Sequence, residues 1–233
     1  MFASGLIALG VFGIANGDWA QEWKFAPAWL PGHQPLAYMT AALMLACGAG
    51  LLWKRTEAIS ARVLVPYWAV VLLLLKVPTV VKHPLVEVAW QSMSEVLVPF
   101  SAACVLFAAG KTDARGVRIA QLVFGAALIP FGLSHFAYVA QTAPLIPAWL
   151  PFHTALAYGT GAAQVAAGTG VLLGIYARLA AALQAALLTL FTTLVWIPMI
   201  IAKPASPDLW SEFTMSWAIA AGAWVVAASF PDR

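Results

Sequence analysis

The chain has 233 residues, of which 63% are hydrophobic and only 9% are charged, with a net charge of +3. An ordinary soluble domain carries roughly 25% charged residues, so this composition excludes a soluble fold. It predicts an integral membrane protein, because helices surrounded by lipid can be apolar on every side. The basic residues are spread over loops, which indicates contact with a lipid bilayer and no nucleic-acid partner.

Eight apolar stretches follow one another, each near the length that crosses roughly 30 Å of hydrocarbon as a helix. They cover residues 2–19, 36–53, 63–81, 92–109, 117–138, 154–173, 177–202 and 209–229. None shows the alternation of a barrel strand. The first lacks a basic flank and a cleavage pattern, which favours a retained helix over a signal peptide. The expected fold is therefore all-α, a polytopic membrane bundle of eight transmembrane helices.

The two halves of the chain resemble one another at an offset of 120 residues. Residues 27–53 and 147–173 align without gaps and match at 15 of 27 positions, including a shared PAWLP loop. The sequence predicts two four-helix repeats, 1–114 and 115–233. Because each would contain an even number of crossings, the two are expected to be parallel repeats.

Basic residues in short loops predict the orientation, since Lys and Arg accumulate on the cytoplasmic side. Eight fall on the side of the N-terminus and four on the other. The first group is Lys54, Arg55, Arg62, Lys111, Arg115, Arg118, Arg178 and Arg233, and the second is Lys24, Lys76, Lys82 and Lys203. We expect both termini in the cytoplasm and any chemistry near the outer face.

Two charged residues lie inside predicted membrane helices, where charges are costly and usually paired. Lys76 lies near the outer end of the third stretch and Glu95 at a similar depth in the fourth. We predict an ion pair between them that faces the interior of the bundle. The alternative is a lysine that extends to the membrane interface and a glutamate at a helix start.

Three histidines lie near the outer ends of predicted helices. His33 and His153 occupy equivalent positions in the two repeats, and His135 lies in FGLSHF. Facing imidazoles could bind haem iron. However, the spacing matches no ligand motif and interfacial histidines are commonly polar caps, so neither haem nor a metal site is expected. Trp29 and Trp149 are typical of an aromatic belt at the membrane interface.

The run from Arg118 to Pro198 contains FGLSHF, PAWLP, ALAYGTGAAQVAAGTGVLL, ARLAA and WIP. In these motifs it resembles the DoxX family of small four-helix membrane proteins, and the N-terminal half resembles a more diverged copy. The whole chain is thus similar to a tandem fused pair. Family members often carry an acidic residue ahead of the paired glycines in the second helix. Here the matching positions are Gln164 and Met44, which argues against a membrane carboxylate there.

The resemblance implies a redox-associated, quinone-linked membrane subunit, which as an enzyme would be the membrane subunit of an oxidoreductase with a redox partner. Quinone is the candidate cofactor, since an apolar slot with a few polar groups would hold it. The catalytic residues are unknown. The candidate outer pocket consists of His33, His135, His153, Trp29, Trp149 and Gln164.

A second hypothesis, from a different functional class, stays open. The chain could be a non-catalytic membrane component: a lipid or small-molecule binder, a transporter-like bundle, or an anchor for a partner. In either case the expected location is the inner (plasma) membrane of a bacterium.

Overall fold

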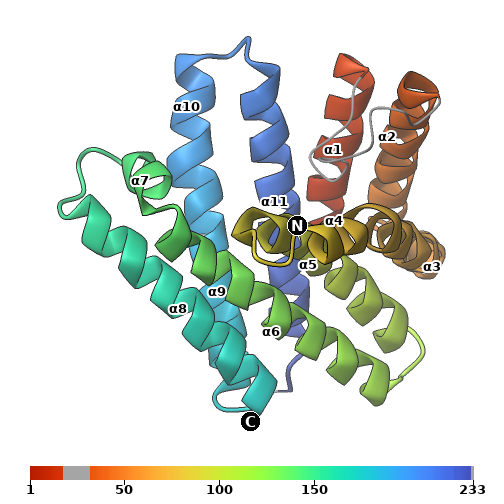
Figure 1. Cartoon of the computed structure of the whole chain (residues 1–233). Helices are drawn as coiled ribbons and strands as arrows, with labels where there is room; N and C mark the ends of the chain where they lie inside the picture. Colours follow the sequence, from red (N-terminus) through yellow and green to blue (C-terminus); the bar gives the residue numbers. More distant parts are fainter. Residues whose placement is uncertain (18–31, 232–233) are drawn as a thin grey trace.

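The computed structural model describes residues 1–17 and 32–231, and the regular structure within them is helical (Figure 1). The helices are α1 Phe2–Asn16, α2 His33–Gly50, α3 Lys54–Val71, α4 Val77–Lys82, α5 Glu87–Ala109, α6 Ala114–Ala137, α7 Val139–Thr142, α8 His153–Leu173, α9 Ala177–Phe191, α10 Ile197–Ala202 and α11 Pro207–Ala228. This architecture agrees with the all-α class expected from the sequence.

The prediction of eight transmembrane helices is wrong. In the described ranges, four helical stretches are long and apolar enough to cross a membrane: Lys54–Lys82, Glu87–Ala109, Ala114–Ala137 and Ala177–Ala202. Helix α1 has 15 residues, which at about 1.5 Å per residue is shorter than the hydrocarbon layer. Helices α2, α8 and α11 are longer but rich in weakly hydrophobic Ala, Gly, Ser and Thr. Counting those residues as fully apolar caused the error.

Two of the long helices contain a five-residue π-helical turn at equivalent positions. Leu72–Lys76 joins α3 to α4, and Thr192–Trp196 joins α9 to α10. Each turn is followed after one residue by a proline, Pro78 or Pro198. A proline ring collides with the carbonyl four residues earlier in an α-helix, and a wider π turn relieves that collision. The proline pair therefore accounts for the matching turns.

Helices α1 and α2 pack closely, as do α6 and α8. Glycines make this approach possible. A Cβ atom added to Gly132 would lie 2.5 Å from the carbonyl oxygen of Gly161, and one added to Gly168 would lie 2.6 Å from that of Gly125. Small residues commonly allow such contacts between membrane helices. The pair α6 and α8 therefore forms a tightly packed wall, which supports the site described below.

The halves of the molecule interlock. Helix α1 packs against α11, α6 against α5, and α5 against α11, so the first helix of each predicted repeat lies on the last helix of the other (Figure 1). Local details also recur 120 residues apart. The Nε1 atom of Trp90 donates to the carbonyl of Pro84 at 3.0 Å, and that of Trp210 to Pro204 at 2.9 Å. These features support a duplication, and the boundary between 1–114 and 115–233 stays a prediction.

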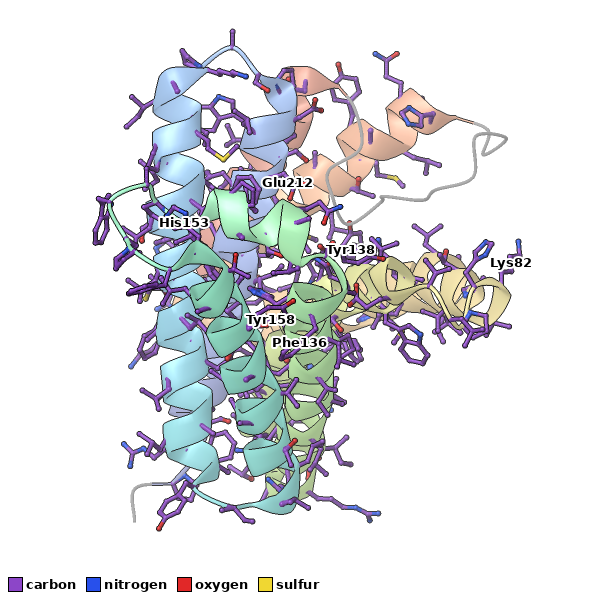
Figure 2. All side chains as sticks on the ribbon, turned by 60° about the vertical axis from the view of Figure 1, so that its left-hand side comes forward. Lys82, Phe136, Tyr138, His153, Tyr158 and Glu212 are labelled. Atoms are coloured by element: carbon purple, nitrogen blue, oxygen red, sulfur yellow. The ribbon has the colours of Figure 1, made fainter. Side chains whose placement is uncertain are left out.

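The helix that ends at Lys82 projects away from the second half of the chain. Figure 2 shows it running across the direction of α8 and α9. It packs against α5 through α3, the π turn and α4. Lys76 lies in the π turn, and its side chain is 1% exposed.

Candidate functional site

A cavity of about 190 Å³ lies between α5, α6, α8, α9 and α11, beneath the segment of α7 and the turn that follows it. Its walls are mainly apolar. The apolar part comes from Phe131, Leu145, Leu188, Phe191, Val195 and Ile219. Polar side chains from several helices also line it, among them Glu95, Ser134, His135, Thr160, Gln164 and Glu212. An apolar chamber with a few convergent polar groups is the usual form of a small-molecule site.

His135 lies near the C-terminal end of α6 and is 8% exposed. Its Nδ1 atom lies 3.2 Å from the carbonyl oxygen of Ala157 and 3.1 Å from the hydroxyl of Thr160, both on α8. The ring stacks on Phe191, with centroids 5.6 Å apart. Gly161 permits this approach, because a Cβ atom there would lie 2.7 Å from the Cβ of His135. The imidazole is thus held from α8 and α9.

Both polar contacts of the ring are made by one nitrogen, since Nδ1 lies within hydrogen-bond distance of the Ala157 carbonyl and of the Thr160 hydroxyl. In a neutral imidazole one ring nitrogen donates and the other accepts. The contacts with α8 therefore fix the orientation of the ring through a single nitrogen.

Gln164, on α8, is 2% exposed and lines the cavity. Its Oε1 atom has no hydrogen-bond partner among the described residues. Leaving a buried polar atom unpaired costs about 1–3 kcal/mol. The equivalent residue of the first half, 120 positions earlier, is Met44, which is fully buried. An apolar side chain therefore fits this helix position, and in the second half a glutamine with a buried, unpaired oxygen stands in the lining of the cavity.

Two carboxylates line the cavity, Glu95 on α5 and Glu212 on α11, and these two helices pack against each other. In Figure 2, Glu212 lies close to the short helix α7. Nearby, the Nζ atom of Lys76 donates to the hydroxyl of Ser92 at 2.9 Å, and Ser92 lies one turn before Glu95 on α5. Lys76 is therefore buried against α5. Its ion pair with Glu95 stays a prediction.

The structure brings together two residues of the predicted pocket, His135 and Gln164. His153 instead lies at the start of α8, where its Nε2 atom is 3.2 Å from the carbonyl of Pro147. Trp149 is 71% exposed, and His33 is exposed at the start of α2. These three residues do not line the described cavity. Trp29 lies outside the described residues.

Sequence reasoning missed several residues of the cavity. It missed Thr160, Thr192, Trp196 and Glu212. A signal was available for Thr160, which lies one turn before Gln164 on the same face of α8. The other three lie on other helices, and their convergence depends on how those helices pack, which a single sequence does not show.

Together, the four apolar stretches mark the chain as a helical membrane protein. Residues 124–227 match the model of a family described as a domain of unknown function (DUF8561), which is less than half of the chain. The matched range contains His135, Gln164 and Glu212 and excludes Glu95. No curated protein and no solved structure matches the chain.

Proposed function

We propose that this chain is a DoxX-like membrane protein that binds the ring of a quinone-type molecule in the described cavity, as a redox-associated membrane subunit. The observation that carries the proposal is a mainly apolar cavity of about 190 Å³ with the buried polar side chains of His135 and Gln164 in its lining. Quinone-type rings are flat and apolar and carry one oxygen on each side. Gln164 and His135 are polar groups that such oxygens can meet.

The size of the cavity supports a single ring. An engineered apolar cavity of about 150 Å³ binds benzene. A cavity of about 190 Å³ has room for one substituted six-membered ring. A groove lined by Val88, Tyr138 and Gln141 meets the cavity at Gln91, Ser134, Thr142 and Leu145, which line both. A hydrocarbon tail attached to the ring would leave the cavity along this groove.

The test is ligand content and ligand-induced stability. Protein purified in mild detergent is extracted for quinone, and its unfolding temperature is measured with and without tetramethylbenzoquinone. The proposal predicts co-purified quinone and a rise in unfolding temperature that Gln164→Met abolishes. The control is Gln184→Leu, which replaces another buried glutamine that does not line the cavity. A ligand effect that is absent from the wild type, or equal in Gln164→Met, contradicts the proposal.

A redox role further requires a partner that exchanges electrons with the bound ring. Affinity capture of the tagged chain from solubilised membranes would identify such a subunit. The alternative is a non-catalytic small-molecule binder, for which an apolar cavity with a few polar groups is sufficient. Ligand binding together with the absence of any redox partner supports that alternative.

The proposed location is the inner membrane of a bacterium, with both termini in the cytoplasm. The distribution of Lys and Arg over the loops supports this orientation. Single cysteines introduced at Thr112 and at Leu85, which is exposed between the first two candidate spans, test it in a Cys47→Ala, Cys104→Ala background with a membrane-impermeant thiol reagent. Labelling in intact spheroplasts is expected at position 85 and not at 112. The reverse pattern contradicts the proposed orientation.

A further inference from the structure

The two halves of the chain differ in the side chains that they place at one pair of equivalent positions. In the first half the π turn ends at Lys76, whose Nζ atom donates to the hydroxyl of Ser92 on α5 at 2.9 Å. In the second half, 120 residues later, the π turn ends at Trp196, and the equivalent of Ser92 is Glu212 on α11. Trp196 and Glu212 both line the cavity. The two positions thus meet in a hydrogen bond in the first half and border the cavity in the second.

A second pair of equivalent positions differs in size. Leu188 lines the cavity, and its equivalent in the first half is Trp68, which is fully buried. The first half therefore carries a bulkier side chain at a position that lines the cavity in the second half.

The indole of Trp196 brings a hydrogen-bond donor to the lining of the cavity. Trp90, Trp210 and Trp224 each donate the indole N–H to an oxygen of the chain. Trp196 makes no such bond with the residues that the structure describes, and its nitrogen is not sealed in the core as that of Trp68 is. Indole N–H groups at buried positions usually have a partner. The N–H of Trp196 is therefore a donor left over for a ligand.

The chemistry of this donor matches a ring carbonyl. The indole nitrogen only donates, whatever the pH. The carbonyl oxygens of a quinone-type ring only accept. An acceptor that leaves water for a mainly apolar cavity without meeting a donor keeps the cost of its lost hydrogen bond.

We infer that Trp196 recognises a carbonyl of the bound ring, with its Nε1–H donating to one of the two oxygens of a quinone-type molecule. This inference rests on the proposed function, because it concerns the same cavity and the same ring. It adds a specificity-determining residue that the pocket predicted from the sequence did not contain. A ring of similar shape without oxygen atoms gains nothing from this donor.

The experiment compares two such rings. Equilibrium dialysis of the full chain in detergent, against empty micelles, measures the Kd of tetramethylbenzoquinone, which has two carbonyl oxygens, and of tetramethylbenzene, which has none. Trp196→Phe keeps an aromatic side chain and removes the N–H, so the space that it opens affects both rings. We expect the preference for tetramethylbenzoquinone over tetramethylbenzene to fall by about tenfold in Trp196→Phe, which corresponds to about 1.4 kcal/mol.

The matched control is Trp224→Phe. It removes an indole N–H that donates to Thr189, and neither residue lines the cavity. We expect its preference to stay within about twofold of the wild-type value. An unchanged preference in Trp196→Phe, or an equal fall in Trp224→Phe, overturns the inference and leaves the proposed function standing.

A spectroscopic measurement separates the hydrogen bond from a change in packing. In protein labelled with ¹⁵N in its tryptophan side chains, the indole N–H signal that disappears in Trp196→Phe is that of Trp196. We expect its proton to move further downfield with tetramethylbenzoquinone than with tetramethylbenzene. Equal movement with the two rings overturns the inference.

The variant Leu188→Trp tests whether the ring occupies this cavity. It introduces the side chain that the first half already holds at the equivalent position. We expect it to weaken the binding of both rings by at least about tenfold. Unchanged binding in Leu188→Trp, or binding of neither ring by the wild type beyond the empty micelles, contradicts the proposed function and the inference with it.

Discussion

At the scale of the residue, the buried glutamines limit the stability of the protein. Both Gln164 and Gln184 have a buried side-chain atom without a partner among the described residues. Replacing an unpaired polar group by an apolar one of similar volume removes its desolvation penalty. We expect Gln164→Met and Gln184→Leu each to raise the free energy of unfolding by about 1 kcal/mol. Reversible unfolding in mixed micelles measures this, and a loss of stability in Gln164→Met shows that Oε1 is paired.

A second residue-scale prediction concerns Lys76. Its ammonium group is buried and bonded to Ser92, and the predicted partner Glu95 lies one turn further along α5. We expect Lys76→Met and Glu95→Gln to be coupled by about 1–3 kcal/mol in a double-mutant cycle, since contacting residues are non-additive. The pair Lys82→Met and Glu95→Gln serves as the control. Additive effects of the first pair contradict the ion pair.

At the scale of the element, the close packing of α6 against α8 leads us to predict different effects of two Gly→Ala substitutions on stability. A methyl group at Gly168 would meet the backbone oxygen of Gly125, whereas one at Gly159, on the same helix, would meet nothing within 4 Å. We expect Gly168→Ala to lower the free energy of unfolding by about 1–3 kcal/mol, because the added methyl group overpacks the contact. Gly159→Ala should leave the free energy of unfolding unchanged or raise it by up to about 1 kcal/mol, because alanine has the higher helix propensity. Thermal unfolding compares the two, and equal effects contradict the close contact.

The helices themselves were largely predictable, and their lengths and membrane roles were less so. The apolar run from residue 63 marked the third helix, yet the helix begins at Lys54, because a charged amphipathic turn forms a helix without being apolar. Helix α7 escaped prediction because four residues, VAQT, carry no periodic signal. Hydropathy reports exposure to lipid, whereas helix bounds depend on hydrogen bonding.

At the scale of the whole molecule, the site depends on helices from both halves. Glu95 comes from the first half, and His135, Gln164 and Glu212 come from the second. Sequence reasoning proposed His135 as a histidine near the outer end of a helix, and Gln164 as the residue at the position where members of the resembled family often carry an acidic side chain. It grouped them with His33 and His153, which occupy equivalent positions in the two repeats. The interlocked packing of α5 with α6 and α11 assembles a different set, and no local pattern encodes that packing.

A further prediction at this scale concerns the extraction of the protein from membranes. With four helical stretches able to cross a bilayer, the chain should stay in the membrane pellet after alkaline carbonate extraction. A peripheral protein held by its basic residues would be released, since electrostatic attachment does not survive that treatment. The solubilised protein is the control for aggregation, and release into the supernatant would contradict a membrane-spanning fold.

The central claim is that a ring binds between His135 and Gln164. An experimental structure of the full chain in lipid nanodiscs, with saturating tetramethylbenzoquinone, tests it most directly. We predict density for one flat ring in the cavity, with a ring oxygen within hydrogen-bond distance of the side chain of His135 or Gln164. An empty cavity, or a ring bound elsewhere on the protein, would contradict the account.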